Sequence, residues 1–140
     1  NMTRILGIIP SRYQSQRLPG KPLINLQGKT IVQRVYEQVS KSKLLTDAIV
    51  ATDDNKILEH VESFGGRAMM TAKTHQNGTE RCAEVAERMP EFDFVINIQG
   101  DEPFIFPIQI DELAKVLAAE NAEIATQEDL LEAENYLKNQ

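Results

Sequence analysis

The sequence predicts an α/β domain of the Rossmann-like class, with a mostly parallel sheet and helices on both faces. Its 140 residues suit a single domain. Apolar stretches alternate between the period of a buried strand and that of a helix, which is typical of βαβ units. The most unusual motifs follow directly after predicted strands, where parallel sheets bind their ligands.

The first elements follow from the apolar period. The run Ile5–Ile9 is apolar apart from Gly7, as expected for a strand buried on both faces. Apolar residues at helical spacing predict a helix from about Thr30 to Lys43. The segment Asp47–Thr52 is then predicted to form a second strand.

The alternation continues through the rest of the chain. Asp53 or Asp54 is expected to cap a helix that ends at the Gly65-Gly66 pair. A strand, a helix and a strand are predicted next, at Arg67–Thr71, Thr79–Met89 and Asp93–Ile98. Pro107 is suited to open a further helix. Its predicted core side consists of Leu113, Val116 and Leu117.

Positive charge is concentrated near the beginning of an acidic chain. The net charge is −6, yet residues 1–43 hold eight Lys or Arg side chains and a single acidic residue, Glu37. Arg12, Arg17 and Lys21 follow the first strand in a loop that prolines and a glycine keep out of helix. Arg and Lys are suited to phosphate oxygens, so this loop predicts a triphosphate site. The alternative is a solvated surface loop.

A second motif, Gln99-Gly100-Asp101-Glu102-Pro103, follows the fourth predicted strand. Mg²⁺ commonly takes one or two carboxylates together with phosphate oxygens and waters, which makes Asp101 a candidate ligand. A polar turn before proline accounts for the same residues. Because the basic loop is predicted at the same edge of the sheet, the magnesium interpretation is favoured.

The third motif is His75-Gln76-Asn77-Gly78-Thr79-Glu80-Arg81. Asn-Gly predicts a tight turn, and the helix start after it presents backbone amides. Gln76, Asn77 and Arg81 are candidates to contact the edge of a base, although a turn and a helix start explain these residues equally well. Cys82, the only cysteine, is predicted to be a buried small apolar residue.

Composition excludes several classes of protein. No apolar stretch approaches the ~20 residues of a membrane span, and the first residues show no signal-peptide pattern. The overall acidity argues against a general nucleic-acid binder. A single cysteine allows neither an intrachain disulfide nor a thiolate metal cluster. We therefore expect a cytoplasmic protein without membrane or nucleic-acid partners.

Five motifs together resemble one family, the 3-deoxy-manno-octulosonate (KDO) cytidylyltransferases, or CMP-KDO synthetases. They are IPSRY at 9–13, RLPGKPL at 17–23, VATDD at 50–54, HQNGTER at 75–81 and QGDEP at 99–103. The resemblance runs from about Thr3 to Leu117. It implies a fold of the nucleotide-diphospho-sugar transferase type. It also implies an enzyme that joins CTP and KDO, with Mg²⁺ as cofactor, and releases pyrophosphate and CMP-KDO for lipopolysaccharide biosynthesis.

The resemblance also implies roles for residues at matching positions. The triphosphate would be held by Ser11, Arg12, Arg17 and Lys21, with Pro10 in the same nucleotide-binding set. The cytidine pocket would contain Gln76, Asn77, Gly78 and Arg81. Gln99 would lie near nucleotide and sugar, and Asp101 would bind Mg²⁺. The implied catalytic residues are Arg12, Arg17, Lys21 and Asp101.

Two departures from the family concern the end of the chain. Family members are considerably longer, and Ala125 stands where the family has a metal-binding Asp. We expect one nucleotidyltransferase domain over residues 1–140 with a family segment missing near 122–127, and a homodimer when that segment is present. The alternatives are another sugar nucleotidyltransferase, similar to the CMP-sialic acid synthetases, or a non-catalytic nucleotide-binding remnant.

Overall fold

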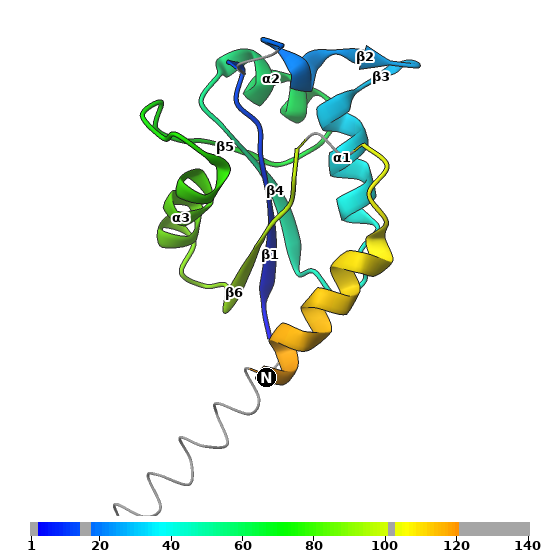
Figure 1. Cartoon of the computed structure of the whole chain (residues 1–140), viewed down its shortest axis with the longest axis vertical. Coiled ribbons are helices and arrows are strands. Elements are labelled where there is room, and N and C mark those ends of the chain that lie inside the picture. The colour runs from blue at the N-terminus through cyan, green and yellow to red at the C-terminus, as the bar shows by residue number, and fades with distance from the viewer. Residues whose placement is uncertain (1–2, 15–17, 101–102, 121–140) are drawn as a thin grey trace, which may run out of the picture.

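A computed structural model describes residues 3–14, 18–100 and 103–120 of the chain. Its main sheet has four parallel strands in the order β5-β4-β1-β6, with helices against both faces (Figure 1). The strands are β1 (Ile5–Pro10), β4 (Asp47–Thr52), β5 (Ala68–Met70) and β6 (Phe94–Asn97). The predicted Rossmann-like α/β class is confirmed.

The central strand β1 fixes the register of its neighbours. Ile8 pairs with Ile49 of β4 on one side and with Asn97 of β6 on the other. The strand β5 is shorter than the predicted 67–71, although hydrogen bonds to β4 continue from both flanking residues. Val50 donates its N–H to the carbonyl of Arg67, and Thr71 donates to the carbonyl of Thr52.

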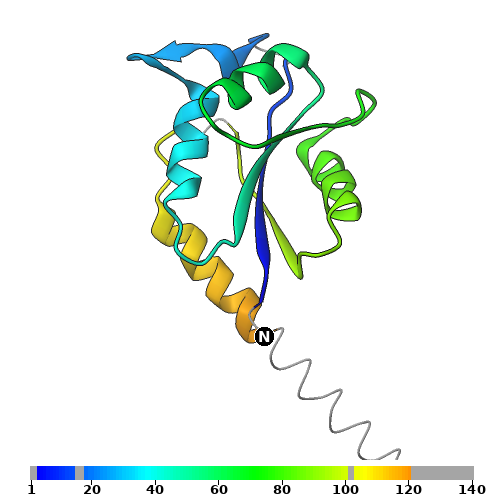
Figure 2. The same cartoon turned by 180° about the vertical axis from the view of Figure 1, so that it is seen from behind.

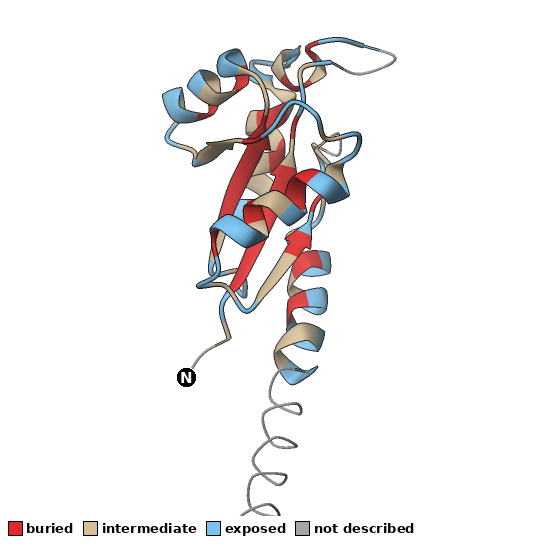
Figure 3. Cartoon of the chain, turned by 90° about the vertical axis from the view of Figure 1, so that its left-hand side faces the viewer, coloured by how far each residue is buried: buried red, intermediate tan, exposed pale blue. Residues whose placement is uncertain are grey.

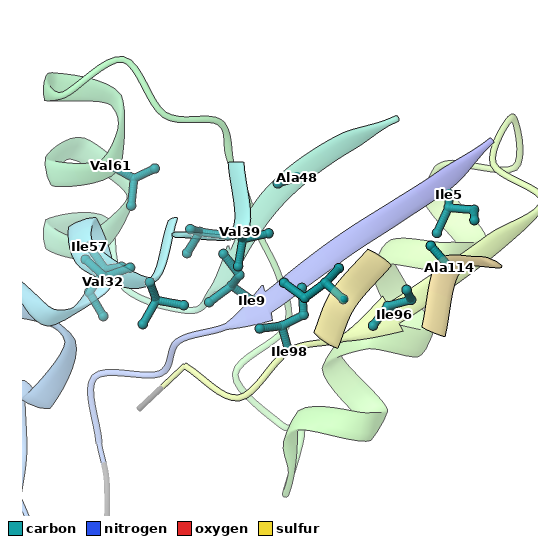
Figure 4. Packing of buried hydrophobic residues seen from close by; sticks show 13 residues of the cluster. Ile5, Ile9, Val32, Val39, Ala48, Ile57, Val61, Ile96, Ile98 and Ala114 are labelled. Atoms are coloured by element: carbon teal, nitrogen blue, oxygen red, sulfur yellow. The ribbon is translucent and has the colours of Figure 1, made fainter. Parts of the chain in front are cut away.

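Helices cover both faces of the sheet (Figure 2). One face packs against α1 (Ile31–Ser40), α2 (Asn55–Ser63) and the helix over residues 107–120, and the opposite face packs against α3 (Gly78–Arg88). Side chains of β1 alternate between these layers: Ile5 and Ile9 pack in the first, and Leu6 and Ile8 in the second. Figure 3 shows the buried strands of the sheet in red, and Figure 4 shows the side chains of the first layer, among them Ile5 and Ile9. Burial on both faces explains the continuous apolar run of the strand.

Polar caps set the starts of the first two helices. Thr30 caps α1, its hydroxyl accepting the N–H of Gln33 at 3.3 Å. Asp54 caps α2 by accepting the N–H of Ile57 at 3.2 Å, so of the two aspartates proposed for this position Asp54 is the cap. Gly65, with a φ of 84°, lies just beyond the end of α2, as the glycine pair predicted.

The helix over residues 107–120 was predicted correctly, but its core side was not. Ile110 and Ala114 are buried and Leu117 is half-buried against the core, whereas Leu113 is 47% exposed and Val116 is 54% exposed. The buried residues recur at i, i+4 and i+7, which is one face of the helix. The prediction was therefore right for Leu117 and wrong for Leu113 and Val116.

A short hairpin before α1 was not predicted. Its strands are β2 (Asn25–Leu26) and β3 (Lys29–Thr30), joined by a two-residue turn. Gln27 and Gly28 in this turn have φ values of 53° and 96°, the pattern of a type I′ turn. A 3-10 turn, η1 (Lys21–Leu23), precedes the hairpin.

Within the part of the chain that the structure describes, no helix is long and apolar enough to cross a membrane. The segment near 122–127, where we expect a family segment to be missing, lies outside the described residues.

Candidate active site

The strand order places two predicted loops side by side. In the order β5-β4-β1-β6 the chain reverses its direction of winding between β1 and β6, because β4 and β5 follow on one side of β1 and β6 on the other. Such a switch point opens a crevice at the carboxyl ends of the two strands. The basic loop follows β1 and the Gln99–Pro103 motif follows β6, so both begin at this crevice.

Two glycines show how tightly the loops meet. A Cβ atom on Gly100 would lie 2.6 Å from the carbonyl oxygen of Pro10 and 3.3 Å from Oγ of Ser11. A Cβ atom on Gly78, the first residue of α3, would lie 3.0 Å from Cγ of Pro10. The backbones of the second and third motifs therefore both press against the beginning of the basic loop.

The basic loop is closed by contacts between its two ends. Gly20 donates its N–H to the carbonyl of Tyr13 at 2.7 Å, and its φ of 72° lies in the left-handed region that favours glycine. A Cβ there would approach Cε2 of the Tyr13 ring to 3.2 Å. The ammonium of Lys56 in α2 lies 5.5 Å from the centre of the same ring. Tyr13 thus contacts both Gly20, at the other end of the loop, and Lys56 of α2.

The candidate triphosphate residues differ in their surroundings. Ser11 is 3% exposed and donates its N–H to the carbonyl of Ala51 at 2.8 Å, and its Oγ lies 3.5 Å from the carbonyl of Ile9. Arg12 is exposed and Lys21 is half-buried. Arg17 and Asp101 lie outside the described residues, so their closeness to one another stays a prediction.

The third motif begins α3 with a polar cap. The side-chain oxygen of Asn77 accepts the N–H of Glu80 at 2.9 Å, and the carboxylate of Glu80 accepts the N–H of Gln76 at 2.9 Å. This exchange resembles a capping box shifted by one residue. Gln76 and Asn77 are exposed, next to a helix start that lies against Pro10. Gln99 is exposed on the neighbouring loop.

Arg81 is held by the protein itself. Its side chain is buried, and the guanidinium donates to Oγ1 of Thr71 and to the carbonyl of Ala72 at 3.0 Å. A second nitrogen lies 3.5 Å from a carboxylate oxygen of Asp53. Contact between Arg81 and a base stays a prediction, whereas its role in joining α3 to the ends of β4 and β5 is a feature of the fold.

Cys82 behaves as predicted. The residue is buried in the layer under α3, and its burial raises the pKa of the thiol to about 11, with the charge of Arg81 acting in the opposite direction. A thiol with so high a pKa is a poor nucleophile at neutral pH.

Two residues near the site were not singled out from the sequence. Asn97 is exposed at the end of β6, with its amide nitrogen 3.8 Å from the position of a Gly78 Cβ. Asn97 and Gln99 are two residues apart and therefore point to the same side of the strand end, and this spacing is the sequence signal by which Asn97 could be found. Glu84 of α3 accepts three hydrogen bonds. Its spacing of four residues from Arg88 is visible in the sequence, but nothing local indicates Ala72 or His75 as partners.

The donor set is compatible with a magnesium ion brought by a nucleotide. Among the described residues, no group of three or more His, Cys, Asp or Glu side chains is placed to hold a metal. A nucleotide-bound Mg²⁺ needs only one or two carboxylates from the protein. The candidate carboxylate, Asp101, directly follows Gly100 in the sequence and lies outside the described residues.

Comparison with known proteins agrees with the geometry. Residues 6–140 match the family model described as cytidylyltransferase. The chain is 48% identical over 136 residues to 3-deoxy-manno-octulosonate cytidylyltransferase of Cytophaga hutchinsonii, which covers 96% of this chain and 54% of that protein. It is 50% identical over 119 residues to the protein of the same name from Geotalea uraniireducens, with 85% of this chain and 47% of that protein covered.

A solved structure is similar as well. CMP:2-keto-3-deoxy-manno-octonic acid synthetase in complex with CTP matches with a TM-score of 0.82 and 41% identity, covering 86% of this chain and 49% of that one. The chain thus spans about half the length of the relatives it matches. The match of the family model over most of the sequence shows that the chain belongs to the cytidylyltransferase family.

Proposed function

We propose that this chain takes part in the transfer of CMP from CTP to KDO. This nucleotidyltransferase reaction releases pyrophosphate and forms CMP-KDO for lipopolysaccharide biosynthesis. The observation that carries the proposal is the packing of Gly100 and Gly78 against Pro10. It brings the start of the basic loop, Gly100 and the N-terminus of α3 together at the carboxyl ends of β1 and β6. The identity to relatives named for this activity supports the same reaction.

The proposed reaction is an in-line attack on the α-phosphorus of CTP. A bond forms between the anomeric oxygen of KDO and phosphorus, and the bond from phosphorus to the bridging oxygen breaks, so that pyrophosphate leaves with that oxygen. The hydroxyl proton passes to water. In such a transfer the protein aligns the reactants and stabilises negative charge. We assign the triphosphate to Ser11, Arg12, Arg17 and Lys21, because Arg and Lys neutralise a departing pyrophosphate.

The base and the metal are assigned to the other two loops. Gln76, Asn77, Gly78 and Arg81 are proposed to surround cytidine, and Gln99 to lie between nucleotide and sugar. Asp101 is proposed to hold Mg²⁺, which would supply positive charge to the phosphate oxygens. We further propose a cytoplasmic protein that forms a homodimer when the family segment near 122–127 is present.

The test is pyrophosphate release by the purified protein with Mg²⁺. With CTP we expect release only when KDO is present, and little release when UTP, GTP or ATP replaces CTP. Sialic acid in place of KDO is the control for the acceptor. Release with sialic acid and not with KDO would contradict the proposed substrate while preserving the reaction class.

A second candidate function is nucleotide binding without transfer. The observation that favours it is Ala125, which stands where the resemblance implies a metal-binding Asp. Such a protein binds CTP with Mg²⁺ but releases no pyrophosphate with any acceptor. Calorimetric titration with CTP, carried out beside the release assay, distinguishes the two functions.

A further inference from the structure

The loop between β5 and α3, residues 71–77, is held by one stripe of α3. Arg81, Glu84 and Arg88 are spaced by three and four residues and so share one face of the helix. Arg81 binds the loop at Thr71 and Ala72, as described above, and Arg88 donates to the carbonyl of Met70 at 2.7 Å. The beginning of the loop is thereby fastened along the helix.

Glu84 is the centre of this network. One carboxylate oxygen accepts the N–H of Ala72 at 2.9 Å and lies 2.8 Å from Nε2 of His75, and the other accepts from Arg88 at 3.0 Å. These bonds join three points of the structure: the beginning of the loop, its middle and the next turn of α3. Among them, the bond from Ala72 contributes most to lowering the pKa of Glu84 to about 2, followed by that from His75.

The end of the loop is fixed by the cap of α3. Gln76 donates its N–H to Glu80, and Asn77 caps the helix through the same residue's N–H. His75 lies between the two halves, with Nε2 at Glu84 and Nδ1 3.9 Å from the carboxylate of Glu80. Without Glu84, the described contacts would leave His75 and the N–H of Ala72 without their shared acceptor.

Apolar packing contributes little to the order of residues 71–77. Its sequence, TAKTHQN, contains no large apolar side chain, and most of its residues are exposed. Fixing a residue costs about 1–2 kcal/mol of backbone entropy, which a polar network must offset. The ordered loop carries exposed Gln76 and Asn77 to the crevice, beside Gly78 and Pro10. Because the loop is ordered before a ligand binds, binding does not have to meet this entropy cost.

We propose that Glu84 is a positioning residue for the nucleotide base: it holds residues 71–77 in the shape that presents Gln76 and Asn77 to the base. The inference rests on the proposed binding of a cytidine nucleotide. It assigns Glu84 no contact with the nucleotide itself. Glu84 is therefore expected to affect binding of the base and not of the triphosphate, because the basic loop is closed by its own contacts at Tyr13 and Gly20.

The test compares ligands with and without a base. Affinities for CTP, UTP and inorganic tripolyphosphate, each with Mg²⁺, are measured by calorimetry for the wild type, Glu84→Ala and Glu84→Gln. The matched control is Glu87→Ala, because Glu87 is an exposed glutamate one turn further along α3. Circular dichroism and the unfolding midpoint verify that each variant is folded.

We expect Glu84→Ala to weaken CTP binding about tenfold and to reduce the preference for CTP over UTP. Tripolyphosphate affinity should change less than twofold. Glu84→Gln, which keeps an acceptor for Ala72 but loses the charge facing Arg88 and His75, should fall between wild type and Glu84→Ala. Glu87→Ala should match the wild type.

Two other results overturn the inference in distinguishable ways. Unchanged discrimination between CTP and UTP in both Glu84 variants, or equal loss of CTP and tripolyphosphate affinity, would show that Glu84 has only a structural role. If Glu84→Ala does not fold, the same comparison of CTP, UTP and tripolyphosphate affinities in Glu84→Gln tests the inference. Failure of the wild type to bind CTP at all would instead overturn the proposed function, and the positioning of a base with it.

Discussion

Gly100 lies so close to Pro10 that a Cβ atom on Gly100 would come within 2.6 Å of the Pro10 carbonyl oxygen. The contact joins the end of β1 to the segment that follows β6, and these two strands flank the switch point of the sheet. Because both partners are backbone or ring atoms, neither can move aside as a flexible side chain would. The approach of the two loops is therefore built into the fold and depends on a residue without a side chain.

Gly100→Ala is expected to destabilise the protein and to weaken CTP binding together. The added methyl group must displace the backbone of one loop, and overpacking of this kind typically costs about 1–3 kcal/mol. Urea unfolding measures the loss of stability, and calorimetry measures the affinity. Gly28→Ala is the comparison, because its Cβ would meet nothing within 4 Å and only its φ of 96° opposes the change. Gly28→Ala should leave CTP affinity unchanged, and a Gly100→Ala variant with native affinity would contradict the proposed convergence of the loops.

Arg17→Ala and Asp101→Asn should each reduce turnover about 10²–10³-fold, by analogy with the removal of one donor that stabilises a transition state. Both residues belong to polar motifs of the sequence rather than to predicted core positions, so the unfolding midpoint should not change. Initial rates of pyrophosphate release with CTP and KDO measure the effect. Lys115→Ala and Glu112→Gln, two exposed positions on the helix over 107–120, serve as charge-matched controls. Full activity in either active-site variant would argue against its assigned role.

The stabilising contribution of Glu84 should depend on pH. Its folded-state pKa is lowered from 4.5 to about 2, chiefly by the hydrogen bond from Ala72 and then by that from His75. A lowered folded pKa means that ionised Glu84 stabilises the fold fully above pH 4.5, and that this contribution is lost as the pH falls towards 2. We expect Glu84→Gln to cost on the order of 1.5–3 kcal/mol at pH 7, the range for hydrogen bonds to charged groups.

The measurement is the difference in unfolding free energy between wild type and Glu84→Gln at pH 7, 5 and 3. That difference should be similar at pH 7 and 5 and clearly smaller at pH 3. Glu87→Gln at the same pH values removes a carboxylate without these partners and accounts for the general effect of charge. A difference that stays constant down to pH 3 would show that Glu84 is not held as an ionised acceptor.

Much of the fold follows from local pattern. The strand Asp47–Thr52 was predicted with its observed bounds, because a buried parallel strand is an apolar run between polar residues. The cap of α2 was narrowed to two aspartates and the structure selects Asp54. The hairpin around Gln27 and Gly28 was missed, since strands of two residues have no period and Gln is not a typical residue for a type I′ turn.

What local pattern does not determine is the identity of distant partners. The sequence favoured Leu113 and Val116 as core residues of the last helix, but the packing of α1 and the sheet selects the face with Ile110 and Ala114. The motif around Arg81 was recognisable, yet its engagement with Thr71 and Asp53 depends on how β4 and β5 end beside α3. The same holds for Glu84, whose bonds reach a segment nine to twelve residues earlier.

Asp111 should be the main polar attachment of the helix over residues 107–120. Its carboxylate accepts the backbone N–H groups of Lys43 and Leu44 and the hydroxyl of Ser42, all from the segment after α1. Partial burial of Asp111 opposes its ionisation, but the hydrogen bonds from Ser42, Leu44 and Lys43 outweigh burial and lower its pKa. Removing the acceptor leaves two N–H groups and a hydroxyl without this partner.

Asp111→Ala is therefore expected to lower the free energy of unfolding by about 1.5–3 kcal/mol, the range for hydrogen bonds to a charged group. Urea unfolding provides the measurement, and hydrogen exchange should show faster exchange of the Lys43 and Leu44 amides. Glu112→Ala, an exposed acidic neighbour on the same helix, is the control and should change stability by less than about 0.5 kcal/mol. The loop carrying Gln99 joins β6 to this helix. A weaker CTP affinity of Asp111→Ala would therefore show that loosening the helix also disturbs that loop. Equal stability of Asp111→Ala and Glu112→Ala would show that apolar packing of Ile110 and Ala114 alone attaches the helix.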